Sequence, residues 1–211
     1  RTMVGAGINA AAQHSQMLTA IFTHIPGLKV VCPSNPYDAK GLLIQSIRDN
    51  DPVIFFEPLR GYRMVSDEVP AGDYTIPFGQ LRTIREGDDV TLVTWSASVP
   101  VVEEAAELLA EEGISCHVVD LRTLVPLDEE GVVAAVERTG RCVVVHEAPA
   151  TAGFGAEVIT LLQEQAFYSL EAPMKRIAAP DGPYPPPGVE HFYVPSAELV
   201  VRAVKETLED R

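Results

Sequence analysis

The segment from residue 28 to residue 56 constrains the fold most. Leu28–Cys32 is a short, largely apolar run closed by Pro33, and Val53–Phe56 is a second one. Both runs are typical of buried strands. The residues between them predict a helix, with Asn35 as its N-cap residue and proline at the first helical position. A strand, a helix and a strand within about 30 residues predict a βαβ unit, with parallel strands and a right-handed crossover.

The same alternation returns further along the chain and predicts a second α/β domain. Strands are expected at Val90–Trp95, Ser115–Val119, Cys142–Val145 and Met174–Ala178, with helices at about 99–112, 128–138, 155–166 and 196–208. Residues 58 to about 80 contain repeated proline and glycine without a sustained period. We therefore expect an α/β fold with a first unit at 1–66, a linker at 67–80 and a parallel-sheet domain at 81–211.

The beginning of the chain differs from a usual domain start. It opens with Arg1 instead of an initiator methionine and runs into a small-residue stretch from Gly5 to Ala12. This weak first element suggests a fragment or a processed piece of a longer protein.

Charge and cysteine content restrict the class of protein. The formal charge of the 211 residues is −14, and no apolar run reaches the roughly 18–20 residues that span a bilayer. The net negative charge argues against non-specific binding to nucleic acid or to an anionic membrane. Cys32, Cys116 and Cys142 lie far apart, which favours a reducing compartment.

The charge is divided unevenly between the two predicted units. Residues 1–66 carry a net charge of +2, and residues 67–211 carry −16. The acidic second unit suggests either solubility alone or docking onto a basic partner. The Pro-rich turn at 181–188 is expected to be an ordered surface arm.

Two histidines and one His-Glu pair are candidates for chemistry. His14 lies at a loop-to-helix junction, where it could face a cleft or serve only as a capping or surface residue. His24 has no such setting and is expected to be structural. His146 and Glu147 follow a strand at its carboxyl end, where ligands collect in open α/β sheets. Because neighbours in extended chain point to opposite faces, a contact between domains or subunits is the favoured interpretation for this pair.

Two further patterns carry alternatives. Gly153 to Ala156 precedes a helix and could cradle a phosphate, but it lacks the glycine pattern of a nucleotide site, so tight packing of a helix start is favoured. Ser46, Asp49 and Asp51 surround a helix C-terminus, where free carbonyl oxygens suit a monovalent cation. Ordinary solvation of that helix end is the alternative.

Taken together, several segments resemble one family. The linker motif lies at Gly72–Pro77, and the others are His14–Gln16, His24–Val31, Asp38–Leu43, Asp51–Pro58, Asp120–Pro126, His146–Pro149 and Glu171–Pro173. The chain resembles the β subunit of 2-oxo acid dehydrogenase decarboxylases over essentially its whole length.

The resemblance implies an architecture and a set of partners. The fold would be the carboxyl-terminal part of a transketolase-like pyrimidine-binding domain followed by a transketolase-type carboxyl-terminal domain. The family uses thiamine diphosphate with Mg²⁺, held mainly by the α subunit, to decarboxylate a 2-oxo acid and acylate a lipoyl group. Two α and two β subunits form a heterotetramer that docks on the acyltransferase core through a small, often basic subunit-binding domain. Such complexes are cytoplasmic in bacteria and lie in the mitochondrial matrix in eukaryotes.

The resemblance also implies site residues. The family's active-site histidine corresponds to His14, and its structural potassium site uses main-chain carbonyls corresponding to Ser46, Ile47, Asp49 and Asp51. The part of the pyrimidine domain with the cofactor-activating glutamate would precede Arg1, so these residues alone are not expected to catalyse the reaction.

Several functional alternatives remain at this point. The segment Phe55–Pro58 with Tyr62-Arg63 resembles the branched-chain 2-oxo acid type, and pyruvate and acetoin enzymes are similar. A non-catalytic assembly module is a second hypothesis, which the retained His14 and βαβ unit disfavour. Half of a transketolase or deoxyxylulose-phosphate synthase is a third, which the linker motif disfavours.

Overall fold

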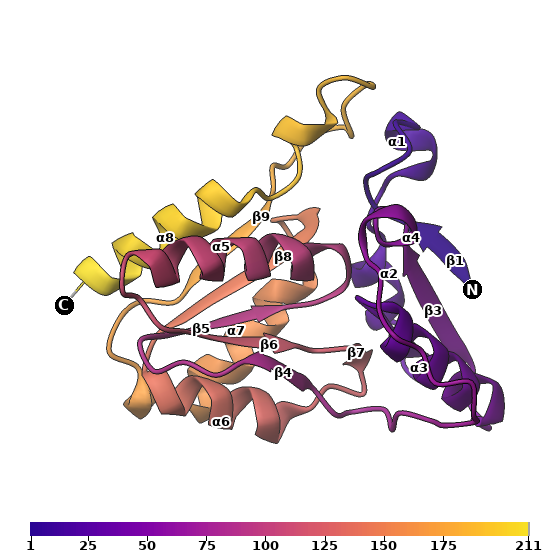
Figure 1. The fold of residues 1–211 in the computed structure, drawn as a ribbon, viewed down its shortest axis with the longest axis horizontal. Coiled ribbons are helices and arrows are strands. Elements are labelled where there is room, and N and C mark those ends of the chain that lie inside the picture. Colours follow the sequence, from indigo (N-terminus) through magenta and orange to yellow (C-terminus); the bar gives the residue numbers. More distant parts are fainter. Residues whose placement is uncertain (211) are drawn as a thin grey trace.

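The chain forms two β-sheets that pack side by side, each with its own helices (Figure 1). A computed structural model describes residues 1–210. Its four-stranded sheet has the order β1-β3-β2-β7, and its five-stranded sheet has the order β4-β6-β5-β8-β9.

The smaller sheet contains the predicted βαβ unit. Strands β2 (Lys29–Val31) and β3 (Val53–Pro58) pair in parallel, with helix α3 (Pro36–Arg48) between them in the chain. The Asn35 side chain accepts a hydrogen bond from the main-chain N–H of Asp38, which confirms the predicted N-cap. Strand β1 (Thr2–Val4) adds to the other edge of β3, also in parallel.

The larger sheet is parallel except at one edge. Strands β5 (Val90–Thr94), β6 (Cys116–Asp120), β8 (Cys142–Pro149) and β9 (Lys175–Ala179) run in parallel, whereas β4 (Arg82–Arg85) pairs antiparallel with β6. The helices of this domain are α5 (Val99–Glu111), α6 (Glu129–Thr139), α7 (Phe154–Gln165) and α8 (Ala197–Glu209).

Helices cover both faces of the larger sheet (Figure 1). On β8, Val143 and Val145 pack in one core cluster with residues of α5 and α8. Cys142 and Val144, which alternate with them, pack in another cluster with residues of α6 and α7. This alternation explains why the central strands read as uninterrupted apolar runs.

The two sheets are joined by a strand and by a shared core. Strand β7 (Thr123–Val125) follows β6 in the chain but pairs antiparallel with β2 of the smaller sheet. Cluster residues of the smaller sheet, such as Val30 and Phe56, belong to the same core as Trp95 and Leu121. The packing between the two halves is therefore continuous.

Short helical segments complete the fold. Helices α1 (Ala11–His14), α2 (Thr19–Thr23) and α4 (Gly61–Met64) belong to the first half, and single 3₁₀ turns lie at η1 (Ser96–Ser98), η2 (Phe167–Ser169) and η3 (Glu190–Phe192). Among residues 1–210, no helix combines the length and apolar character needed to cross a membrane.

The predicted alternation is confirmed, but three strands were not predicted. Strand β4 is an edge strand with arginine at both ends, and such charged edges lack a clear apolar pattern. Strands β1 and β7 have three residues each, too few to show a period of two. Strand β1 precedes the small-residue stretch from Gly5 to Ala12, which forms the loop into α1 and the beginning of that helix.

Candidate functional site

His14 lies at the C-terminal end of α1, exposed to solvent. Its side chain makes no hydrogen bond to any residue in the range 1–210. The next residue, Ser15, is buried with an unpartnered hydroxyl, and its main-chain N–H donates to Ala11 O at 3.1 Å. The helix thus keeps its last turn closed while the imidazole remains free to bind an outside group.

The His146-Glu147 pair contacts both halves of the chain, as the interdomain interpretation predicts. The two side chains point in opposite directions from β8. Glu147 accepts a hydrogen bond of 2.5 Å from the main-chain N–H of Ala6, in the first half. His146 stacks on Trp95, with ring centroids 5.2 Å apart. Burial and the nearby Arg176 lower the pKa of His146 to about 4, so its ring is neutral at physiological pH.

The glycines at the start of α7 serve to pack that helix against His146. A Cβ atom on Gly153 would lie 2.8 Å from His146 Cε1, and one on Gly155 would lie 2.5 Å from His146 Cδ2. The helix start packs too closely for any side chain at these positions. The packing interpretation of this glycine pair is confirmed.

Glu147 gives the first testable prediction. Burial raises the pKa of this carboxyl from 4.5 to about 7, because the Ala6 N–H and Arg60 offset only part of the lost hydration. The folded state thus favours the protonated form: the stability that Glu147 contributes is full below pH 4.5 and is lost as the pH rises through 7. Relative to Glu147→Gln, the wild type should lose about 3 kcal/mol of unfolding free energy across that range.

Urea unfolding of both proteins at a series of pH values measures this difference. His146 and the buried Asp120, whose pKa burial raises to about 6, titrate in both proteins and cancel in the comparison. A difference that stays constant with pH would contradict the prediction.

Asp38 and Arg122 form a buried ion pair across the two halves. The Arg122 guanidinium donates to the Asp38 carboxylate from Nε at 3.1 Å and from Nη2 at 2.7 Å. The Asp38 side chain is fully buried, and Arg82 approaches it at 3.5 Å. Beside this pair, Ser34 Oγ donates to Asp120 at 2.5 Å. The segments Asp38–Leu43 and Asp120–Pro126 therefore hold the first half to the second.

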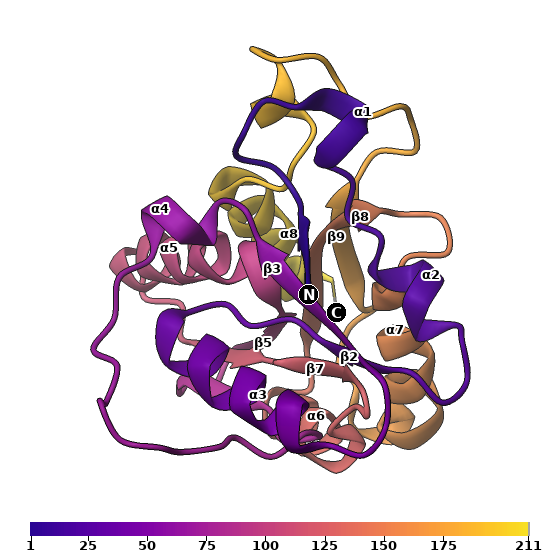
Figure 2. The same ribbon diagram turned by 90° about the vertical axis from the view of Figure 1, so that its right-hand side faces the viewer.

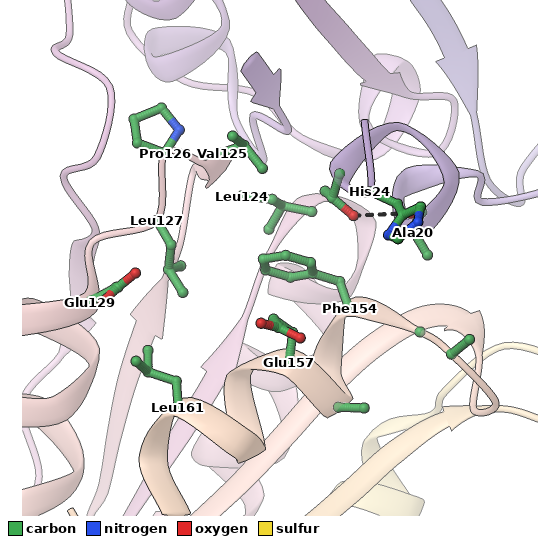
Figure 3. A pocket seen from close by; sticks show the side chains of 14 residues that line it. Ala20, His24, Leu124, Val125, Pro126, Leu127, Glu129, Phe154, Glu157 and Leu161 are labelled. Carbon is green, nitrogen blue, oxygen red and sulfur yellow. Dashed lines mark hydrogen bonds between the residues drawn. The ribbon is translucent and has the colours of Figure 1, made fainter. Parts of the chain in front are cut away.

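A cavity of about 670 Å³ lies between α2, β7 and α7 (Figure 3). Its wall is largely apolar, with Leu124 and Phe154 among the lining side chains, and His24, Glu129 and Glu157 are its titratable groups. His24 is exposed at the end of α2. His14 lines neither this cavity nor its neighbour of about 390 Å³ beside Tyr184.

The end of α3 was predicted to hold a potassium ion. The carboxylates of Asp49 and Asp51 bind the Lys29 ammonium at 2.7 and 3.0 Å, and Ser46 Oγ donates to Leu42 O. These side chains are therefore already paired, which leaves only the main-chain carbonyls of the last helical turn for a cation. Carbonyl coordination by Ser46, Ile47, Asp49 and Asp51 stays a prediction.

Other metal ligands do not gather among the residues that the structure describes. Within residues 1–210, no three His, Cys, Asp or Glu side chains are placed to hold a metal ion together. The described residues thus offer no side-chain site for the Mg²⁺ of a diphosphate.

Two domain families match the chain. Residues 1–64 match the transketolase pyrimidine-binding domain, and residues 79–200 match the transketolase C-terminal domain. This chain belongs to the transketolase family. The fold class inferred from the sequence is thereby confirmed.

Relatives within the transketolase family narrow the comparison. The chain is 52% identical to the β subunit of acetoin:2,6-dichlorophenolindophenol oxidoreductase from Cupriavidus necator, over 99% of this chain and 62% of that protein. It is 44% identical to the β subunit of 2-oxoisovalerate dehydrogenase from Bacillus subtilis, over 99% of this chain and 64% of that protein. It is 46% identical to the β subunit of the pyruvate dehydrogenase E1 component from Staphylococcus aureus, with the same coverage. The chain thus spans less than two thirds of these relatives.

Solved structures show the same fold. A split-gene transketolase, an inactive β4 tetramer, superposes with a TM-score of 0.79 at 27% identity, covering all of this chain and 66% of that one. A transketolase from Pichia stipitis superposes with a TM-score of 0.66 at 14% identity, covering 98% of this chain and 29% of that one. The resemblance to dehydrogenase β subunits, inferred from motifs, is confirmed by the relatives above.

Sequence reasoning missed the polar contacts that join the two halves. The contacts from Ala6 to Glu147 and from Asp38 to Arg122 connect residues 141 and 84 positions apart. The only local signal was the Gly5-Ala6-Gly7 run, whose glycines both adopt positive φ.

Proposed function

We propose that this chain is the β-subunit part of a thiamine-diphosphate-dependent 2-oxo acid dehydrogenase and that it acts only together with an α subunit. The observation that supports the proposal is 44–52% identity over 99% of the chain to the β subunits of an acetoin oxidoreductase, a 2-oxoisovalerate dehydrogenase and a pyruvate dehydrogenase. The bacterial relatives and a mitochondrial one from Arabidopsis thaliana support a bacterial cytoplasm or a mitochondrial matrix as the location.

In this proposal, His14 is the catalytic residue of the chain. When bound by the α subunit, thiamine diphosphate supplies the decarboxylation chemistry. The exposed imidazole of His14 would bind the substrate carboxylate or the incoming dithiolane and would supply a proton as charge changes. No group in residues 1–210 competes for its ring nitrogens, which leaves both available to the substrate side.

Three substrates are candidates. The branched-chain 2-oxo acid was inferred from Phe55–Pro58 with Tyr62-Arg63. Phe56 is buried in the core, whereas Phe55, Glu57, Pro58 and Tyr62 line a cavity of about 490 Å³. The 52% identity to the acetoin enzyme, against 44% for the 2-oxoisovalerate enzyme, favours acetoin as a second candidate. Pyruvate is the third.

The test is a turnover assay on the chain at its natural full length, co-expressed with its α partner. Thiamine diphosphate and Mg²⁺ are added, and an artificial electron acceptor replaces the lipoyl core. Turnover of 3-methyl-2-oxobutanoate or pyruvate supports the proposal and assigns the substrate. Turnover of acetoin alone, which has no carboxyl group to lose, would keep the β-subunit assignment but replace the 2-oxo acid by acetoin. No turnover of any of them, with α bound and cofactor retained, would favour the assembly-module hypothesis.

We also propose that the carboxyl-terminal domain docks on a basic subunit-binding domain of the acyltransferase core. A groove between α5 and α8 combines apolar residues with five glutamates and two basic residues: Leu108, Val201, Glu111, Glu112, Glu198, Glu206, Glu209, Arg202 and Lys205. Such an acidic surface steers a basic partner through a field that salt screens.

Raising the salt concentration from 0.05 to 0.5 M should therefore weaken this docking by about tenfold or more, measured by titration calorimetry. Replacing Glu198 and Glu209 by glutamine should reduce the salt dependence. Affinity that does not change with salt would contradict electrostatic docking.

A further inference from the structure

The loop that leads into α1 adopts backbone dihedral angles that its non-glycine residues do not favour. Between β1 and α1, φ is positive at Gly5 (82°), Gly7 (124°) and Asn9 (55°), and it is again positive at Ala11 (50°). Asn and Ala pay a steric cost in this region, so the conformation persists only where surrounding contacts enforce it. Those contacts come from the carboxyl-terminal domain.

Two carboxylates accept consecutive N–H groups of this loop. Glu147 Oε1 accepts from Ala6 N at 2.5 Å, and Glu190 Oε1 accepts from Gly7 N at 2.7 Å. Glu147 lies on β8 and Glu190 on η3, so the loop is held from two separate elements. A carboxyl oxygen can accept such a hydrogen bond whether or not the group is protonated.

An apolar contact supports the same loop. The Ala6 side chain is buried in a small cluster with Tyr184 and Val194, which belong to the segment between β9 and α8. Both views of the ribbon show this segment beside α1 at one end of the molecule (Figures 1 and 2). This arm, residues 180–196, contains the Pro-rich turn at 181–188 that the sequence predicted to be an ordered surface arm.

The arm is itself fixed to the larger sheet. Asp181 accepts hydrogen bonds from Thr151 N at 2.9 Å and Thr151 Oγ1 at 2.5 Å, just after β8. The Tyr184 ring packs at a tilt of 54° against the Tyr193 ring, with ring centroids 4.8 Å apart. The arm therefore forms a preformed support instead of a loose segment.

We propose that Glu147 and Glu190 are positioning residues that hold the loop 5–10 and thereby set the place of His14. The inference rests on the proposed role of His14 at the active site. Gly5 fits this arrangement, because a Cβ atom there would lie 2.8 Å from Glu147 Oε1 and would push the carboxylate away. The carboxyl-terminal domain thus contributes to the active site without touching the substrate.

The experiment compares variants in the α-assembled enzyme at its natural length. Glu147→Leu removes the acceptor at similar size, whereas Glu147→Gln keeps an acceptor oxygen. Glu190→Ala tests the second contact at a surface turn, where substitution does not disturb the core. Glu164→Ala is the matched control, since this exposed carboxylate on α7 makes no contact with the loop.

Hydrogen exchange at the Ala6 and Gly7 amides is the readout that does not depend on activity. Glu147→Leu and Glu190→Ala should each raise that exchange by about tenfold and lower kcat, whereas Glu147→Gln and Glu164→Ala should leave both near wild type. In a His14→Ala background, Glu147→Leu should lower kcat no further, because both changes remove the same contribution.

Each other outcome is decisive. If amide exchange at Ala6 and Gly7 is unchanged in Glu147→Leu and Glu190→Ala, the two carboxylates do not hold the loop 5–10. This conclusion stands even where His14→Ala confirms the proposed function. Raised exchange with unchanged kcat, or additive loss in the double variant, overturns the positioning role. Full activity of His14→Ala would instead show that His14 has no catalytic role. Amide exchange at Ala6 and Gly7 would then still show whether Glu147 and Glu190 hold the loop.

Discussion

Replacing His14 by alanine is expected to lower kcat of the α-assembled enzyme by about 10²- to 10⁴-fold, the usual contribution of a positioned proton donor or acceptor. The expectation rests on the place of the residue. His14 is exposed at the end of α1 and makes no hydrogen bond within residues 1–210, so its removal leaves no buried group unpaired. The loss should therefore appear in turnover and not in folding.

His24→Ala is the control for this experiment. His24 is also an exposed histidine at the end of a short helix, α2, and no catalytic part is assigned to it. The substrate is whichever of the three candidates the enzyme turns over, and unfolding by urea verifies that both variants keep wild-type stability. If His14→Ala keeps wild-type kcat, the histidine is a surface residue and the proposed mechanism is wrong.

Replacing Arg122 by alanine is expected to destabilise the chain by about 3–5 kcal/mol, because the buried Asp38 carboxylate loses its close cationic partner and keeps only the Asn35 amide at 2.7 Å and Arg82 at 3.5 Å. The Arg122 guanidinium makes two hydrogen bonds to that carboxylate, whose side chain has no exposed surface. Arg82, at 3.5 Å, is too distant to replace both bonds. Urea unfolding of wild type and variant measures the loss.

Arg138→Ala is the matched control. Arg138 also pairs with two carboxylates, Glu86 and Asp88, but all three side chains are well exposed. Exposed ion pairs contribute about 0–1 kcal/mol, so this variant should stay near wild type. Equal losses in the two arginine variants would show that the Asp38 pair carries no special energy.

Much of the fold was predictable because its central strands and helices follow simple periods. The βαβ unit, the N-cap at Asn35 and the four long helices of the second domain agree with the apolar pattern. Strand β7 could not be predicted, because its partner β2 lies about 90 positions earlier and three residues show no period.

The candidate site was less predictable from residues alone. Spacing around His14 left a surface role open, and only the resemblance to dehydrogenase β subunits assigned it to catalysis. The hydrogen bonds that hold the loop before His14 could not be predicted from the sequence. The contacts of Ala6 with Glu147 and of Gly7 with Glu190 join residues 141 and 183 positions apart. A single sequence carries no local sign of such pairing.

Because strand β7 pairs with β2, the boundary between the two matched domain families does not separate two units that fold independently. A fragment that began at residue 79 would carry β7 without β2, its only partner strand in residues 1–210. A fragment that ended at residue 64 would expose the same edge of β2 and the apolar side chains that pack beneath Leu124. Unpaired strand edges beside apolar surface promote aggregation. Expressed separately, the two halves should therefore be insoluble, and each should need the other during refolding.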